Sequence, residues 1–219
     1  MLISWFRLDV TAAERPRFDT GMKLWSSLQE AEGFLGRLGG WDQEGRACVF
    51  TLWRDVGALR LFRRRQSAAL LERTGLGPWF EGRMPGLIEV LLPIPGLCTT
   101  TASLLQRGRM LRMVSAQADP REELRILEEQ ASVWKPALSR SPGMLGAYFG
   151  SSMEEPGHYF GASIWASKED LRRWSEEGYR ACIEAARRVE FQPAREGLKV
   201  TLDPEWTVQR PSWNRQAAG

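Results

Sequence analysis

The chain has 219 residues, of which 43% are hydrophobic and 26% charged, as in an ordinary globular protein. A net charge of +3 is a weak excess for nucleic-acid binding, and no run of 18 apolar residues indicates a membrane span. Three dispersed cysteines and a single histidine argue against a disulfide framework or a histidine-based metal site, so we expect a cytoplasmic protein without metal, nucleic acid or membrane partner.

Residues 1–94 are expected to form a β-α-β-β-α-β unit. Residues 2–8 alternate in polarity as a strand does. Thr11 and Glu14 have the spacing of a capping box, which predicts a helix to about residue 31. The remaining elements expected here are strands 34–41, 47–53 and 86–92, and a helix that follows Asp55 and ends before Gly75.

Residues 95–106 are expected to be a linker, because Pro93 and Pro95 disfavour both a helix and a central strand. The same order of elements then restarts in residues 107–203, and residues 204–219 form a tail whose tryptophans are expected to pack onto the body. The strands expected in the second half are 110–116, 143–150, 158–165 and 196–202. Its first helix follows Asp119 with the apolar stripe Leu124, Leu127, Ala131, Trp134 and Leu138, and its second follows Ser167 with Leu171, Trp174, Cys182 and Val189.

A short pattern occurs twice in the chain. It consists of a helical tryptophan, a glycine that begins a Gly-x-Leu-Gly stretch, and a strand that ends in tryptophan: Trp25, Gly33 and Trp53, then Trp134, Gly143 and Trp165. The offsets are 134 − 25 = 109, 143 − 33 = 110 and 165 − 53 = 112. So constant an offset predicts an internal duplication in which Trp25 and Trp134 are equivalent core residues.

The strands carry apolar residues on both faces, so each sheet needs a cover on both sides. The fold class expected is therefore α+β: two ferredoxin-like β-α-β-β-α-β halves packed sheet to sheet, as a dimeric α+β barrel made within one chain. A monomer then suffices for the barrel, and further association stays open.

The aromatic and glycine positions of the first half resemble those of the small YdbC-like bacterial proteins in the antibiotic-biosynthesis-monooxygenase-like superfamily of dimeric α+β barrels. The residues that carry the resemblance are Trp5, Trp25, Gly33-Phe34-Leu35-Gly36, Gly39-Gly40-Trp41 and Phe50-Thr51-Leu52-Trp53. It covers about residues 1–92, and the second half resembles a diverged copy. The resemblance implies a pocket between the sheet and the two helices of a half. The wider superfamily includes cofactor-free quinone-forming monooxygenases, haem-degrading enzymes, chlorite dismutase-like proteins and lactone isomerases.

Haem is not expected. Haem-degrading relatives carry a tryptophan on the second helix and a histidine about three turns later. Trp174 matches the tryptophan, but Glu184 stands ten residues further on, and Phe62 of the first half is followed in the same way by Glu72. His158 is expected in a surface turn, so no cofactor is predicted.

A cofactor-free oxygenase must bind a phenol or hydroquinone, help to deprotonate it and hold oxygen in a dry pocket. The candidate pocket residues, from the third strand and second helix of each half, are Trp53, Phe62, Gln66, Ser163, Trp165, Trp174 and Tyr179. Ser163 and Trp165 share one face of a strand. Trp174 and Tyr179 are about 140° apart on a regular α-helix, so they would flank opposite edges of a site.

We expect one half to keep a site and the other to be filled. The kept site should bind a flat apolar molecule with one or two hydroxyl or carbonyl groups. Two alternatives remain open from the sequence: a non-enzymatic hydrophobic small-molecule binding protein, and a structural role in which all these aromatic residues are core. An acid or base beside an aromatic wall would favour an enzyme.

Overall fold

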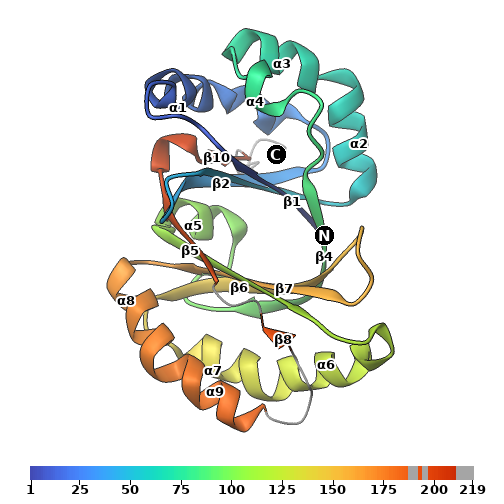
Figure 1. Cartoon of the computed structure of the whole chain (residues 1–219), viewed down its shortest axis with the longest axis vertical. Helices are drawn as coiled ribbons and strands as arrows, with labels where there is room; N and C mark the ends of the chain where they lie inside the picture. Colours follow the sequence, from blue (N-terminus) through green and yellow to red (C-terminus); the bar gives the residue numbers. More distant parts are fainter. Residues whose placement is uncertain (187–191, 194–196, 211–219) are drawn as a thin grey trace, which may run out of the picture.

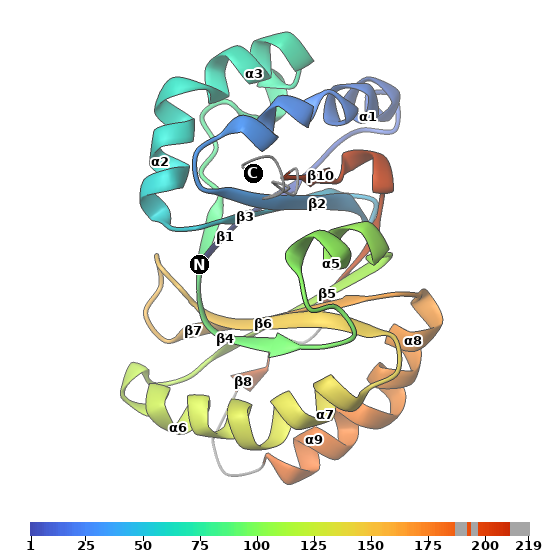
Figure 2. The same ribbon diagram turned by 180° about the vertical axis from the view of Figure 1, so that it is seen from behind.

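The computed structural model describes residues 1–186, 192–193 and 197–210; the expectations for Val189, Glu196 and Trp213 lie outside these residues. Figures 1 and 2 show two sheets that face each other, with helices on the outer face of each. The mixed α+β barrel predicted from the sequence is confirmed. None of the helices in the described ranges combines the length and apolarity needed to cross a membrane.

Each half contributes four main strands and the helices that cover them. The elements of the first half are β1 (Leu2–Leu8), α1 (Arg15–Lys23), the 3₁₀ helix η1 (Trp25–Glu30), β2 (Phe34–Asp42), β3 (Ala47–Trp53), α2 (Val56–Arg65), α3 (Ser67–Thr74), α4 (Gly77–Phe80) and β4 (Gly86–Pro95). The rest of the chain forms α5 (Thr101–Arg107), β5 (Met110–Gln117), the 3₁₀ turn η2 (Pro120–Glu122), α6 (Glu123–Glu129), the π-helix η3 (Gln130–Trp134), α7 (Lys135–Arg140), β6 (Met144–Ser152), β7 (His158–Trp165), α8 (Lys168–Arg173), the π-helix η4 (Trp174–Gly178), α9 (Tyr179–Ala185), β8 (Gln192–Pro193), β9 (Leu198–Leu202), the 3₁₀ turn η5 (Pro204–Trp206) and β10 (Val208–Gln209).

The two sheets are hydrogen-bonded to each other along both edges. Within the halves the strand orders are β4-β1-β3-β2 and β9-β5-β7-β6, all antiparallel. β4 also pairs with β6, and β2 with β9, so eight strands close into one barrel. A glycine permits the close approach at each seam: a Cβ on Gly40 would lie 1.9 Å from the Thr201 carbonyl oxygen, and one on Gly150 would lie 2.2 Å from that of Glu89.

Alternate residues of each strand point into the barrel or toward the helices. In β1, Ile3 joins the barrel core, whereas Leu2 and Leu8 pack under the first-half helices. The barrel core mixes residues of both halves, among them Phe50, Ile88, Leu111, Leu145 and Val200. This shared core explains why the strands are apolar on both faces.

The segment expected as a linker contains the helix α5, which lies between the two sheets (Figure 2). Its Leu104 and Leu105 are buried in the barrel core, where they fill the space left by two glycines: Cβ atoms on Gly146 and Gly36 would lie 2.6 and 2.3 Å from these leucines. Thr100 caps the helix by accepting from the Ser103 N–H. The sequence does not predict a helix here, because the two adjacent leucines are too few to define a helical period.

β4 extends through Pro95, which the two prolines argued against. The pairing of β4 with β1 ends at Glu89, and beyond it β4 pairs with β6. Pro93 and Pro95 therefore lie where the opposite edge of β4 has no strand partner in the described chain, a position that tolerates a missing N–H.

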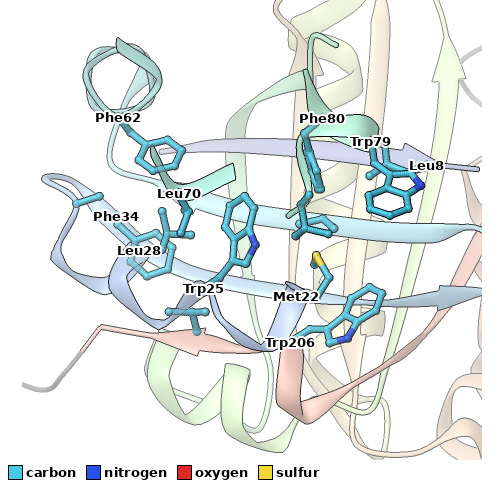
Figure 3. Packing of buried hydrophobic residues seen from close by; sticks show 14 of the residues in the cluster. Leu8, Met22, Trp25, Leu28, Phe34, Phe62, Leu70, Trp79, Phe80 and Trp206 are labelled. Carbon is cyan, nitrogen blue, oxygen red and sulfur yellow. The ribbon is translucent and has the colours of Figure 1, made fainter. Parts of the chain in front are cut away.

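The first-half core lies between its sheet and its helices (Figure 3). It includes Trp25 and Phe18, together with Trp206 from η5, which is fully buried although it comes from the end of the chain. Trp206 packs 5.4 Å from Trp41 and 5.5 Å from Phe18 between ring centroids. The C-terminal segment thus completes the core of the opposite half.

Candidate functional site

Each half encloses a cavity between its sheet and its helices. The first-half cavity has a volume of about 410 Å³ and lies under η1, α2, α3 and α4. The second-half cavity has a volume of about 260 Å³ and is lined by residues that include Arg112, Glu129, Trp134, Ser163, Trp174 and Tyr179. The expectation that one of the two spaces is filled by side chains is therefore wrong.

Aromatic rings form the walls of the second-half cavity. Trp134 and Tyr179 come from neighbouring helices and lie 5.5 Å apart between centroids. Tyr159 and Phe149 stack on the strand side, with centroids 5.9 Å apart. Trp25 and Trp134 each line the cavity of their own half, but Trp25 is buried whereas Trp134 is half-buried at the edge of its core, so the predicted core position holds for Trp25 only.

Two π-helical turns shape this cavity, and both lie in its lining helices. In η4 the Tyr179 N–H donates to the Trp174 carbonyl, and in η3 the Lys135 N–H donates to the Gln130 carbonyl, both five residues back. The wider turn places residue 179 nearly above residue 174, so Trp174 and Tyr179 both line the cavity instead of flanking opposite edges. The separation expected from a regular α-helix is corrected by this local geometry.

Arg112 extends from β5 into the wall of the second-half cavity. Its side chain is nearly buried, and its guanidinium lies 4.3 Å from the centroid of the Tyr179 ring. Burial lowers the pKa of Arg112, and its contact with the Tyr179 side chain partly opposes that shift. Arg112 lines the cavity, and no carboxylate of the described chain forms a salt bridge with it.

Glu129 is the last residue of α6 and is also nearly buried. One carboxylate oxygen accepts a hydrogen bond from Trp134 Nε1 at 3.1 Å, while Oε2 has no partner within the described ranges. Burial raises the pKa of Glu129, and the bond from Trp134 lowers it by less. A carboxylate with one free oxygen in an aromatic cavity can accept or donate a proton.

Ser163 lines the second-half cavity, but Trp165, which was predicted to line it as well, does not. Trp165 is fully buried beneath the cavity, where its Nε1 donates to Ser163 Oγ at 2.9 Å. The Ser163 hydroxyl in turn donates to the Arg112 carbonyl at 3.4 Å. The pair therefore supports the strand that carries Arg112.

Of the three first-half residues predicted to line a pocket, Gln66 differs from the other two because it lies at the break between α2 and α3. Trp53 and Phe62 line the first-half cavity, whereas Gln66 is exposed and lies outside its lining. Gln66 leaves the helical conformation, with φ of −130°, so Ser67 lines the cavity in its place. That any of these residues binds a ligand stays a prediction.

The sequence analysis missed Arg112 and Glu129. Arg112 carries a weak signal, because it shares the helix-facing side of β5 with the buried Met110. Glu129 carries no such signal, because the sequence pattern predicts the wrong buried face for this helix. Leu124, which the pattern places in the core, is 76% exposed, whereas the helix buries Ile126 and Glu129.

The lining of the second-half cavity lacks the histidine that haem-degrading relatives use. Among its described residues there is also no cysteine or methionine, whereas Tyr148, Tyr159 and Tyr179 are present and tyrosine is a further residue type that can ligate haem iron. The absence of a cofactor therefore stays a prediction. His158 lies outside the lining, where its Nδ1 is 3.0 Å from Glu155 Oε2 and its ring packs on Phe160. No cluster of three potential metal ligands occurs in the part of the chain described.

Comparison with known proteins identifies the fold. Residues 2–77 match a family described as a domain of unknown function, DUF4937. No protein with a curated description matches the sequence. The structure is similar to that of a protein of Lactobacillus acidophilus NCFM provisionally described as a monooxygenase, with a TM-score of 0.68, 13% identity, and coverage of 95% of this chain and 96% of the other.

Two further solved structures agree. One, from Fusobacterium nucleatum, has the same provisional description, with a TM-score of 0.65, 11% identity and coverage of 92% and 90%. The other is an anthrone oxidase-like protein, with a TM-score of 0.59, 14% identity and coverage of 99% and 95%. At these identities the likeness shows the fold alone: the chain has the same α+β barrel fold as these proteins.

Proposed function

We propose that the second-half cavity is the active site of a cofactor-independent oxygenase that acts on a small aromatic or polyketide-like molecule. The observation that carries the proposal is the free carboxylate oxygen of Glu129 in an aromatic cavity that also contains Arg112. An acid or base beside an aromatic wall is the feature that separates an enzyme from a simple binding pocket.

Binding would rest on the aromatic walls and on few polar groups. The cavity volume of about 260 Å³ suits a small ring system. Trp174 Nε1 is buried without a hydrogen-bond partner in the described chain and could donate to a carbonyl or hydroxyl oxygen of the substrate. A flat molecule with one or two such groups satisfies both features.

Glu129 would act as the general base. It takes a proton from a phenol or from an activated methylene, and the electron pair of the broken bond stays on the substrate as a phenolate or enolate. The raised pKa of Glu129 makes it a stronger base than an exposed glutamate. The guanidinium of Arg112, already desolvated, stabilises the anion that forms.

Molecular oxygen would be the oxidant. The electron-rich anion reduces O₂: one oxygen atom becomes the new carbonyl oxygen, and the other leaves as water with two hydrogens of the substrate. For an activated methylene both hydrogens come from the carbon that is oxidised; for a phenol one comes from the hydroxyl group and one from the ring carbon that is oxidised. The aromatic walls would limit the access of solvent to the anion and so slow its protonation.

The test is oxygen uptake by the purified full chain with an anthrone-type probe. Glu129→Gln keeps the shape of the side chain but removes the base, so we expect at least a 100-fold loss of turnover with little change in probe binding. Glu128→Gln, an exposed neighbour on the same helix, should leave turnover unchanged. Equal turnover in the wild type and Glu129→Gln would refute the catalytic role.

The second candidate is a binding protein without catalysis. The first-half cavity favours it, because that cavity has an aromatic wall without a buried acid. Native mass spectrometry separates the two functions: a retained molecule that is recovered unchanged under oxygen supports binding alone.

We also propose that the chain is an internally duplicated, cytoplasmic relative of the YdbC-like proteins. The repeated order of elements and the match of residues 2–77 support this. No second chain is needed, since the barrel closes within one. Homologues of residues 107–203 that never align with homologues of the first half would argue against duplication.

A further inference from the structure

We propose that the first-half cavity is a second binding site, and that it takes an amphipathic carboxylate with an apolar body and one anionic group. The inference rests on the walls and mouth of this cavity, and it does not depend on the chemistry proposed for the other half.

The interior of the first-half cavity is mainly apolar, with the hydroxyl side chains of Ser4 and Thr51 as its buried polar groups. Its walls are formed largely by aromatic rings, namely Phe6, Trp25, Trp53, Phe62 and Phe80. Figure 3 shows Phe62, Trp25 and Phe80 on the helix side of the sheet. The charged residues among the described lining, Arg63, Glu81 and Arg83, are all exposed. A ligand that enters must therefore place a hydrocarbon or aromatic body inside and keep its charge at the mouth.

The mouth carries more positive than negative charge. Arg63 contacts the Met84 sulfur at 3.2 Å, and neither Arg63 nor Arg83 forms a salt bridge within the described residues. The Glu81 carboxylate lies against the start of α4, where a Cβ on Gly77 would be 2.7 Å from Glu81 Oε1. Two arginines are thus free to receive an anion, and a carboxylate suits their planar donors.

A buried cation behind the wall adds to this preference. The guanidinium of Arg37 lies 3.8 Å from the centroid of the Trp25 ring and is completely buried, with no acidic partner among the residues described. Trp25 Nε1 is itself buried without an acceptor. Positive potential acts strongly across a low-dielectric interior, so this cavity favours an anion over a cation of the same shape.

The volume of about 410 Å³ is within the range of small-molecule sites and suits an apolar body of moderate length. Decanoate is therefore a suitable probe, and decanol is its uncharged counterpart with the same chain. Calorimetric titration of the full chain with each probe should show one decanoate site, at least tenfold tighter than decanol.

The double variant Arg63→Gln/Arg83→Gln tests the mouth. It should weaken decanoate at least tenfold, which is about 1.4 kcal/mol, and leave decanol unchanged. Arg64→Gln/Arg65→Gln removes the same charge from exposed positions next along the chain that do not line the cavity, and it should leave both probes unchanged. Equal weakening by the two double variants would overturn the proposal, because it would report net charge alone.

Blocking variants test the location. Thr51 and Ser163 lie at equivalent positions, opposite Ser4 and Arg112 on the neighbouring strands. Thr51→Phe should fill the first-half cavity and abolish decanoate binding, while Ser163→Phe should leave it intact. Loss of binding in Ser163→Phe alone would place the probe in the other half and overturn the proposal. If Thr51→Phe does not fold, the arginine variants still decide.

Discussion

Two arginines are buried on the helix-facing sides of the sheets, and neither forms a salt bridge within the described chain. Arg112 faces a cavity, whereas Arg37 is enclosed by the first-half core, with Nη2 3.1 Å from the Met22 sulfur. Nε and Nη1 of Arg37 have no hydrogen-bond partner in the described residues. An uncompensated buried charge costs several kcal/mol, so Arg37 reduces the stability of the fold.

Arg37→Met should therefore stabilise the protein by about 1–4 kcal/mol, since methionine fills a similar volume without a charge. Urea unfolding at pH 7 measures the change. Arg64→Met, at an exposed position, is the matched control and should change the free energy of unfolding by less than about 0.5 kcal/mol.

The stabilisation by Arg37→Met should depend on pH in a defined direction. Burial lowers the pKa of Arg37 from its ordinary value to about 9, so above about pH 9 the unfolded chain binds more protons than the folded chain. The destabilisation by Arg37 is thus complete below about pH 9 and is relieved as the pH rises above it. A difference between variant and wild type that stays constant up to pH 10.5 would contradict this assignment.

Residue types limited how much of the site could be predicted. Ser163, Trp174 and Tyr179 line the second-half cavity, and they could be predicted as lining because aromatic and small polar side chains on a predicted strand and helix are typical of a cavity wall; that they bind a ligand stays a prediction. Arg112 and Glu129 were missed because a charged residue is by default assigned to solvent. Their burial depends on the cavity itself, which is a property of the assembled layers.

Among the elements, strands were predicted more closely than helices. Alternation within β1 or β3 follows from the pleat and needs no information from elsewhere. The helices depart from the regular α-helical period at three places: the break at Gln66 and the π turns η3 and η4. A prediction from a regular helical period therefore places Gln66 in the cavity lining and assigns the wrong buried face to α6.

The lack of a side chain at Gly178 leaves the space that the Trp174 ring of η4 occupies. A Cβ on Gly178 would lie 2.3 Å from Trp174 Cε3, although the backbone at φ −67° and ψ −41° is ordinary helix. Gly178→Ala should therefore displace the Trp174 ring and destabilise the fold, where alanine in a free helix would stabilise it by roughly 0.5–1 kcal/mol. Thermal unfolding together with a shift in tryptophan emission measures the effect.

The first half supplies a comparison for that change. Gly57 is an exposed helical glycine with Asp55 Oδ1 as its nearest contact, 3.1 Å from the position of a Cβ. Gly57→Ala should be neutral or stabilising. If Gly178→Ala stabilises the protein as much as Gly57→Ala does, the glycine does not constrain Trp174.

At the scale of the whole molecule, the sequence predicted two facing sheets but not the two seams that join them. Strands with two apolar faces require a cover, which is a local property of each strand. The pairing of β2 with β9 joins residues about 160 positions apart, and it depends on how the two twisted sheets align. Gly40 and Gly150 allow the strands to approach closely at these seams, a role that depends on the pairing of the two halves and cannot be read from the sequence.

Trp206 links the end of the chain to the first half. Because it is fully buried against Phe18 and Trp41, Trp206→Ala should destabilise the protein by about 3–5 kcal/mol. Hydrogen exchange should then increase first in α1. Glu205→Ala, at an exposed neighbouring position, should cost less than about 1 kcal/mol. A loss below about 1 kcal/mol for Trp206→Ala would show that η5 is not part of this core.

The place of β9 and η5 in the first half has a consequence for biosynthesis. When residues 1–95 leave the ribosome, β2 has one open edge, and the apolar inner face of its sheet has no partner sheet. The open edge of β2 and the inner face of its sheet both stay uncovered until more than half of the remaining chain has been made. The core around Phe18 is complete only when Trp206 has been added. Open edges and bare apolar faces are the surfaces on which nascent chains associate with one another. We therefore expect ribosome-bound chains that stop before β9 to be bound by chaperones, and their release to follow the emergence of β9 and η5.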